Sequence, residues 1–184
     1  MVVVAPPLTL AAFLELPETE PASEFINGAV VQKPMPQGEH SRLQFKLCAA
    51  VSQVAEPQQV ACTFPELRCV FGGEVIVPDI AVFRWARIPR TESRRVANRF
   101  ELAPDWAIAI LSPGQSSTKL LGKLLHCVQH GAELGWLLDP SEESVLVVLP
   151  EQRVQLLARE ATLPVPQDVD LSLTVAEIFG WLSL

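Results

Sequence analysis

A proline–aspartate pair inside an apolar segment is the feature of this sequence with the clearest chemical potential. Pro78 and Asp79 interrupt the apolar run of residues 75–84. Proline cannot donate a hydrogen bond to a sheet, so Pro78 marks a strand edge or a bulge. A carboxylate at such a place is costly to bury unless it is paired or binds a cation. Asp79 is therefore a candidate metal ligand, and a structural turn or cap is the alternative.

Other titratable residues lie at the entrance of a predicted strand and on one predicted helix face. Glu24 precedes an apolar strand, where a carboxylate is a candidate ligand or is simply solvated. Lys119 and Lys123 share a helix face that can approach a strand end, although outer-face lysines usually serve solubility. His126 and His130 have the i,i+4 spacing with which two imidazoles can share zinc. No third ligand is evident, so two partly exposed histidines are the alternative.

Positive charge is concentrated in one stretch of the chain. Residues 84–99 hold six arginines and one acid, a net charge of +5, whereas the rest of the chain carries −12. The planar guanidinium group of arginine can donate paired hydrogen bonds to phosphate oxygens. Five of these side chains are therefore predicted to contact nucleic-acid phosphates: Arg84, Arg87, Arg90, Arg94 and Arg95. Pairing of these arginines with the many acids of the chain, or with a partner subunit, is the alternative.

Composition limits the classes of protein that remain. The 184 residues, 49% of them hydrophobic, suffice for one domain, and we take residues 1–184 as that domain. A net charge of −7 excludes the strongly basic class of nucleic-acid-binding proteins, so any DNA site must be local. No segment approaches the roughly 18 apolar residues of a membrane span. The four cysteines lack metal-ribbon spacing and no signal peptide is recognised, so we expect a cytoplasmic protein with reduced thiols. We expect no organic cofactor.

Periodicity predicts strands interrupted by a few helices. Apolar residues at three- and four-residue steps predict helices at 40–54 and 117–130, with shorter ones at 8–16 and after a capping box of Thr174 and Glu177. The turn dipeptide Asn27-Gly28 predicts a strand pair or a bent strand within 24–33. Further strands are expected at 59–70, 75–84, 106–112, 135–139, 144–149 and 153–157.

Six segments, in this order, resemble a known family: EFINGAVVQKPMP, GEHSRLQ, PELRCVFGG, IVPDIAVFRW, FELAPDWAIAILSP and LGWLLDP. They look like the restriction-endonuclease family called Uma-two, or domain of unknown function 820, and the resemblance covers nearly the whole chain. It implies the PD-(D/E)XK nuclease superfamily. The implied fold is α/β (α+β), a restriction-endonuclease-like mixed central sheet flanked by helices.

The resemblance also implies which residues form the site. The family's early glutamate matches Glu24, with Gly28 completing its Glu-x-x-x-Gly pattern, and its Pro-Asp carboxylate matches Asp79. These two residues would be ligands of Mg²⁺. The family's lysine matches Lys123, which would orient the attacking water or offset developing phosphate charge.

One position departs from the family pattern. Three residues before Ser112-Pro113 the family has a metal-ligating glutamate, and this chain has Ala109. Magnesium is usually bound through one or two carboxylates plus substrate phosphate, so the loss of one should weaken metal binding sharply. Three acids are candidate substitutes that the sequence alone does not place: Glu66, Glu101 and Asp105.

Two hypotheses about function remain. The first is a magnesium-dependent endonuclease that hydrolyses DNA phosphodiesters despite a degenerate metal site. The second is a catalytically inactive nuclease-fold protein that acts as a nucleic-acid-binding or protein-interaction module. In either case nuclease precedent, together with the apolar strands near the C-terminus, leads us to expect a homodimer.

Overall fold

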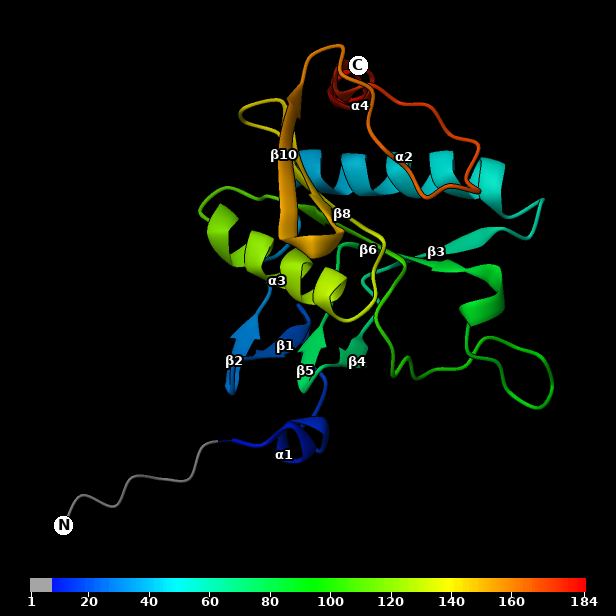
Figure 1. Ribbon diagram of the computed structural model, residues 1–184. Helices are drawn as coiled ribbons and strands as arrows, with labels where there is room; N and C mark the ends of the chain where they lie inside the picture. Colours follow the sequence, from blue (N-terminus) through cyan, green and yellow to red (C-terminus); the bar gives the residue numbers. More distant parts are fainter. Residues whose placement is uncertain (1–7) are drawn as a thin grey trace.

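The computed structural model describes residues 8–184 and is built around a six-stranded sheet (Figure 1). The strand order is β10-β9-β8-β7-β6-β3, and only the β7–β8 pair is parallel. The predicted mixed sheet is therefore confirmed. Its strands are β3 (Ala61–Pro65), β6 (Ile80–Arg84), β7 (Trp106–Ile110), β8 (Leu134–Asp139), β9 (Ser144–Leu149) and β10 (Arg153–Ala158).

Two long helices cover opposite faces of this sheet. Figure 1 shows α2 (Gly38–Ala55, cyan) on one side and α3 (Ser117–Gln129, yellow-green) on the other. Side chains of β7 alternate between the faces, as strand geometry requires. Ile108 packs in the cluster that contains Leu47 of α2, whereas Ala109 packs in the cluster that contains Leu124 of α3. The short helix α4 (Val175–Gly180) joins the α2 face and begins with the predicted capping box.

A second, four-stranded sheet lies below α3 in Figure 1, and the sequence did not predict it as a separate sheet. Its strand order is β2-β1-β5-β4. The members are β1 (Ser23–Ile26), β2 (Ala29–Gln32), β4 (Cys69–Phe71) and β5 (Glu74–Ile76), with the helix α1 (Leu10–Leu14) near them. The predicted turn at Asn27-Gly28 joins β1 to β2, and both residues have positive φ, 51° and 76°.

The two long strands expected at 59–70 and 75–84 are each broken in the middle, which corrects the prediction. The first breaks after β3 at Glu66, whose φ is +50°. The second breaks at Val77–Asp79, where Pro78 cannot supply a ladder donor. At each break the chain passes from one sheet to the other. Apolar runs alone cannot reveal such a break, because both halves of each run remain strand.

The cysteines and the apolar length of the helices agree with what the composition predicts. All four cysteines are free thiols, and Cys69 and Cys127 are buried. None of the helices within residues 8–184 is long and apolar enough to cross a bilayer.

Candidate active site

Asp79 lies where the chain passes from β5 in the small sheet to β6 in the large one. Its side chain is buried, and the residue is only 5% exposed. Oδ2 accepts a hydrogen bond of 2.6 Å from the backbone N–H of Ile110, which attaches the carboxylate to the end of β7. This leaves Oδ1 directed towards charged side chains from other elements. The break at Pro78 therefore places a fixed carboxylate between the sheets.

Lys33 is the cation closest to this carboxylate. Its Nζ lies 2.7 Å from Asp79 Oδ1 and 2.7 Å from Glu66 Oε2, and it donates a third hydrogen bond of 3.0 Å to the Val77 carbonyl. No sequence pattern selected Lys33, which follows β2 in an extended Lys-Pro-Met-Pro segment without periodicity. A signal that could have selected Lys33 was its position just after β2, the second strand of the hairpin that contains the Glu-x-x-x-Gly pattern.

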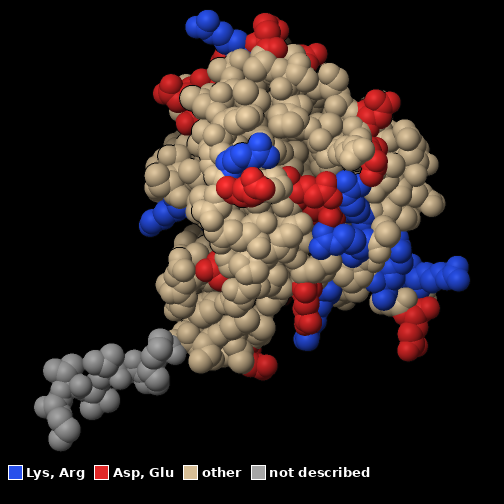
Figure 2. Space-filling view, viewed as in Figure 1, with Lys and Arg blue, Asp and Glu red and all other residues tan. Residues whose placement is uncertain are grey.

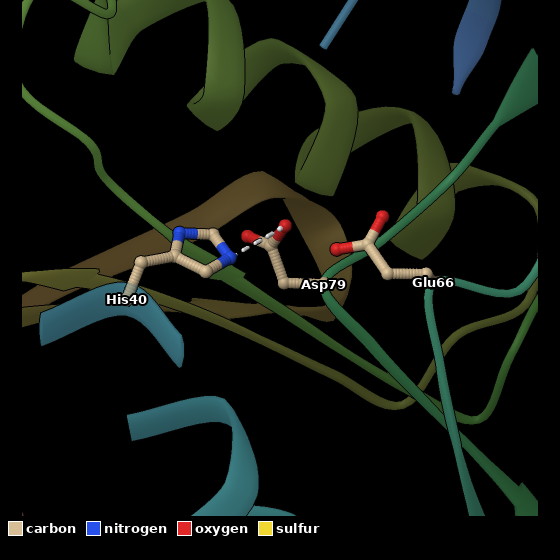
Figure 3. Close-up of side chains that lie close together, drawn as sticks. All are labelled: His40, Glu66 and Asp79. Atoms are coloured by element: carbon tan, nitrogen blue, oxygen red, sulfur yellow. Dashed lines mark ion pairs between the residues drawn. The ribbon is translucent and has the colours of Figure 1, made fainter. Parts of the chain in front are cut away.

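His40 approaches Asp79 from the first turn of α2. Its Nδ1 lies 3.1 Å from Ser112 Oγ, and its Nε2 lies 3.4 Å from Asp79 Oδ1 without forming a hydrogen bond. Figure 3 shows the Asp79 carboxylate between the His40 ring and the Glu66 carboxylate. One ligand atom from each of these three residues lies within 4.8 Å of the other two. Among the residues that the structure describes, this is the one group of three or more acids, histidines or cysteines arranged closely enough to hold a metal ion.

Glu24 and Lys123 form a second charged pair close to the first. Glu24 Oε2 lies 2.8 Å from Lys123 Nζ, and both side chains are largely buried. Glu24 Oε1 also accepts a hydrogen bond of 2.9 Å from the Val77 N–H. Because Lys33 donates to the carbonyl of the same residue, Val77 links the Glu24–Lys123 pair to the Asp79–Lys33 pair. All three residues that the sequence selected as catalytic thus lie around one short segment.

The ionisation of Asp79 and Lys33 is set by their mutual contact. Burial alone would raise the pKa of Asp79, but His40 and Lys33 outweigh that effect and hold the pKa well below its ordinary value. Burial alone would lower the pKa of Lys33, but the charges of Asp79 and Glu66 raise it instead. Near neutral pH the pair is therefore a buried carboxylate and a buried ammonium.

Cavities open on both sides of these pairs. A large open cavity of about 910 Å³ is lined by Glu24 and Lys123, and a second of about 280 Å³ is lined by His40, Glu66 and Asp79. A small void of about 20 Å³ shares lining residues with both cavities, and Ala109 lines it together with Asp79 and Lys123. Lys33 and Gln115 line all three spaces. The charged centre is therefore reachable from solvent.

Of the three acids considered as substitutes at position 109, Glu66 is the one that reaches the centre. Its carboxylate binds Lys33 and also accepts a hydrogen bond of 3.1 Å from Gln44. Asp105 instead pairs with Arg87 and accepts the backbone N–H of Arg84. Glu101 is exposed and makes no side-chain ion pair or hydrogen bond within residues 8–184.

The basic stretch divides into two parts. Arg84 pairs with Glu133 and Asp168 at 2.6 Å each, and Arg87 pairs with Asp105, so these two arginines have internal acidic partners. Arg90 donates to the Trp85 carbonyl and lies over its ring.

The arginines further along the same stretch are free of such partners. Arg94 and Arg95 are exposed, and across residues 8–184 no ion pair or hydrogen bond engages their side chains. Figure 2 shows Lys and Arg side chains gathered on the right-hand side, where Figure 1 draws the loop after β6. The loop begins at the opposite end of β6 from Asp79, roughly 16 Å away along a five-residue strand.

The His126/His130 pair does not acquire a third metal ligand in the part of the chain that is described. The two rings lie 4.2 Å apart between centroids, and His126 Nδ1 is 3.7 Å from Glu74 Oε2. His130 Nδ1 donates to the His126 carbonyl, and His126 Nε2 lies 3.3 Å from the Phe71 carbonyl. The pair packs helix α3 against the small sheet.

Comparisons with known proteins identify the family and the fold of the chain. A family model described as "Putative restriction endonuclease" (Uma2) matches residues 10–176. A crystal structure of a putative nuclease belonging to domain of unknown function 820, from Anabaena variabilis ATCC 29413, is 50% identical in sequence. The similarity spans 96% of this chain and 99% of that one, with a TM-score of 0.93. No curated protein matches the chain. With the family model covering most of its length, the chain belongs to the Uma2 family and has the restriction-endonuclease-like fold.

Proposed function

We propose that the chain hydrolyses phosphodiester bonds of DNA with the help of a divalent metal ion held at Asp79. The observation that carries the proposal is the buried, ionised Asp79 carboxylate, fixed by the end of β7 and open to solvent through a cavity. A carboxylate kept ionised in a buried place is typical of functional sites. Membership of a family described as a restriction endonuclease supports this reading.

The residues of the second pair have distinct roles in the proposal. The ion pair of Lys123 with Glu24 holds the ammonium at the large cavity, where it can orient an attacking water or offset charge on a phosphate. Glu24, expected to be a metal ligand, is proposed here also to fix Lys123. Arg94 and Arg95 are proposed to contact phosphates at a distance from the centre, and Arg84, Arg87 and Arg90 to hold the base of their loop.

The residues around Asp79 fit magnesium only in part. Magnesium requires near-octahedral oxygen ligands at 2.0–2.1 Å and is usually bound by one or two carboxylates with water and substrate phosphate. Asp79 and Glu66 can each supply one oxygen, although both contact Lys33, whereas Ala109 supplies none and the Glu24 carboxylate is held by Lys123. A bound ion would activate water and neutralise phosphate charge. We therefore expect weak magnesium dependence, with saturation only at high concentration of the ion.

A plasmid-cleavage assay tests the proposed function. Purified protein incubated with supercoiled DNA should nick it in the presence of Mg²⁺ or Mn²⁺ and not in the presence of a chelator. Asp79→Asn should lower the rate by at least about 100-fold, because the variant loses the charged ligand. Asp170→Asn, the same change at an exposed acid without a partner among the described residues, is the matched control. Equal nicking by wild type and Asp79→Asn would assign the activity to a contaminant and contradict the proposal.

A second candidate function is favoured by one specific observation. Each carboxylate of the site already contacts a lysine ammonium, since Asp79 and Glu66 share Lys33 and Glu24 pairs with Lys123, and Ala109 offers no further ligand. Because each carboxylate already has a cationic partner, the side chains can remain together without a metal ion. This arrangement is expected for a nuclease-fold protein that binds nucleic acid or a protein partner without cutting. Salt-sensitive DNA binding by a protein that never nicks plasmid would select this candidate.

The expected homodimer remains a proposal. The strand β10 forms one edge of the large sheet, and its Val154 and Leu156 are exposed. An exposed apolar edge strand is a ready surface for pairing with a second copy. Light scattering that gives a monomer mass at tens of micromolar would remove this part of the account.

A further inference from the structure

His40 carries a buried nitrogen that forms no hydrogen bond among the described residues and lies 3.4 Å from Asp79 Oδ1, with which it forms an ion pair only when the ring is protonated. The residue is 7% exposed, and Nε2 forms no hydrogen bond within the described chain. The other ring nitrogen, Nδ1, lies 3.1 Å from Ser112 Oγ. A histidine that donates its Nδ1–H to a neighbour presents the Nε2 lone pair, and this arrangement is typical of metal-binding histidines. A buried polar atom left unpaired costs free energy, so its presence needs a physical reason.

Two carboxylates point to the same place as this nitrogen. Ligand atoms of Asp79 and Glu66 lie within 4.8 Å of each other and of a His40 ring nitrogen. A positive charge is already favoured there, since Lys33 Nζ makes contacts of 2.7 Å to both carboxylates. The ammonium thus marks a position at which the local charges favour a cation.

The same position is accessible and lies beside the proposed active site. The three potential ligands line the cavity of about 280 Å³. Their side chains come from three separate elements: the first turn of α2, the break after β3 and the break before β6. An incoming ion therefore needs no opening of the core. It has to displace only the ammonium of Lys33, whose flexible side chain enters from the end of β2.

We propose that His40 Nε2, Asp79 Oδ1 and the Glu66 carboxylate form a site for one divalent transition-metal ion, with the Lys33 ammonium as its tethered competitor. One imidazole and two carboxylates suit zinc or manganese, whereas magnesium prefers oxygen ligands alone. Three protein ligands leave positions for water or substrate oxygen, as in catalytic rather than structural sites. The Ser112 hydroxyl holds the histidine in its ligating tautomer. The inference rests on the proposed function in that the ion would serve the same centre, but it is tested without DNA.

Lys33 provides the sharpest test, because its removal should strengthen metal binding. In Lys33→Met the two carboxylates face each other without a counterion, so a divalent ion gains an attraction that the ammonium otherwise screens. We expect binding of Zn²⁺ or Mn²⁺ to tighten by about tenfold or more relative to wild type, the scale of a close charge contact. Lys33→Gln, which keeps a hydrogen-bond donor and loses the charge, provides a second variant should Lys33→Met fold poorly.

Isothermal titration of the metal alone into purified apo protein measures these affinities. Wild type should bind Zn²⁺ or Mn²⁺ at one site more tightly than Mg²⁺, and His40→Gln and Glu66→Gln should each weaken that binding by about tenfold or more. The control is His126→Gln/His130→Gln, which removes the other histidine pair and should leave the affinity unchanged.

Three results would overturn the proposal. One is the absence of one-site binding in wild type and in both Lys33 variants. Another is binding that survives both His40→Gln and Glu66→Gln. The third is binding that is lost in the His126→Gln/His130→Gln variant, which would move the ion to that pair. Because the titration contains no DNA, a metal site without cleavage would contradict the proposed function and leave this inference standing.

Discussion

At the residue scale, the contact between Asp79 and Lys33 governs the electrostatics of the site. Both groups are buried and joined at 2.7 Å, so each offsets the desolvation of the other. Replacing Lys33 leaves Asp79 as a buried charge without its lysine, whereas replacing Asp79 leaves Lys33 paired with Glu66. Lys33→Met should therefore lower the free energy of unfolding by about 3–5 kcal/mol, and Asp79→Asn should lower it by less. The double variant should lose clearly less than the sum of the two, and urea unfolding at pH 7 measures all three.

The pH dependence of the free energy of unfolding is a second test of the interaction between Asp79 and Lys33. Because the pKa of Asp79 is lower in the folded than in the unfolded protein, its stabilisation is fully present above an unfolded pKa of about 3.9 and is lost as pH falls further. The free energy of unfolding of wild type should decline below about pH 4, and the decline should be shallower in Asp79→Asn. Strictly additive losses at pH 7 with identical acid slopes would show that the two residues do not interact.

The break at Pro78 could predict Asp79, the resemblance to the family could predict Glu24 and Lys123, and the structure brings all three to one short segment. They could not predict Lys33, Glu66 or His40 as neighbours of Asp79. Glu66 reaches the site because its backbone turns at φ +50°, and His40 because α2 begins beside the end of β7. Neither the backbone turn at Glu66 nor the position at which α2 begins can be recognised from hydrophobic periodicity.

At the element scale, the loop after β6 has a fixed base and a free tip. Arg84 and Arg87 are held by Glu133 and Asp105, whereas Arg94 and Arg95 are exposed. Their different environments predict different effects of the same substitution. Removing a held arginine should lower stability, and removing a free one should change only binding to DNA.

The salt dependence of DNA binding separates these effects. If Arg94 and Arg95 each contact a phosphate, the variant Arg94→Ala/Arg95→Ala should reduce the slope of log affinity against log salt by roughly 1.8 in magnitude, since each neutralised phosphate contributes about 0.9. Its melting temperature should match that of wild type. The matched variant Arg84→Ala should instead melt lower. Fluorescence anisotropy with a short duplex at several salt concentrations gives the slopes. An unchanged slope in Arg94→Ala/Arg95→Ala would show that these two arginines do not contact DNA phosphates.

At the scale of the whole molecule, apolar periodicity predicted most elements, and the resemblance to the family predicted the mixed character of the main sheet. Apolar periodicity did not predict that the chain divides its strands between two sheets. The division depends on two interruptions, at Glu66 and at Pro78, within runs that are apolar on both sides. The site lies between the sheets because of these same interruptions. Net charge was a weaker guide, since a total of −7 conceals a positively charged side of the molecule.

The central claim is that the centre around Asp79 is a nuclease site that lacks one carboxylate, at Ala109. The void of about 20 Å³ beside Ala109 is lined by Asp79, Lys33 and Lys123, so a glutamate there would enter between a potential ligand and two cations. The lysines would offset its charge, which would otherwise be costly to bury. Ala109→Glu should therefore fold and supply the missing oxygen ligand.

The most direct measurement is the rate of Mg²⁺-dependent plasmid nicking by Ala109→Glu compared with wild type. The account predicts a rate at least about tenfold higher, because one more carboxylate ligand beside Asp79 should make magnesium bind more tightly. Magnesium should also raise the melting temperature of the variant more than that of wild type, since a ligand of the folded state stabilises it. A folded Ala109→Glu protein that nicks no faster than wild type, and whose melting temperature does not respond to magnesium, would contradict the claim.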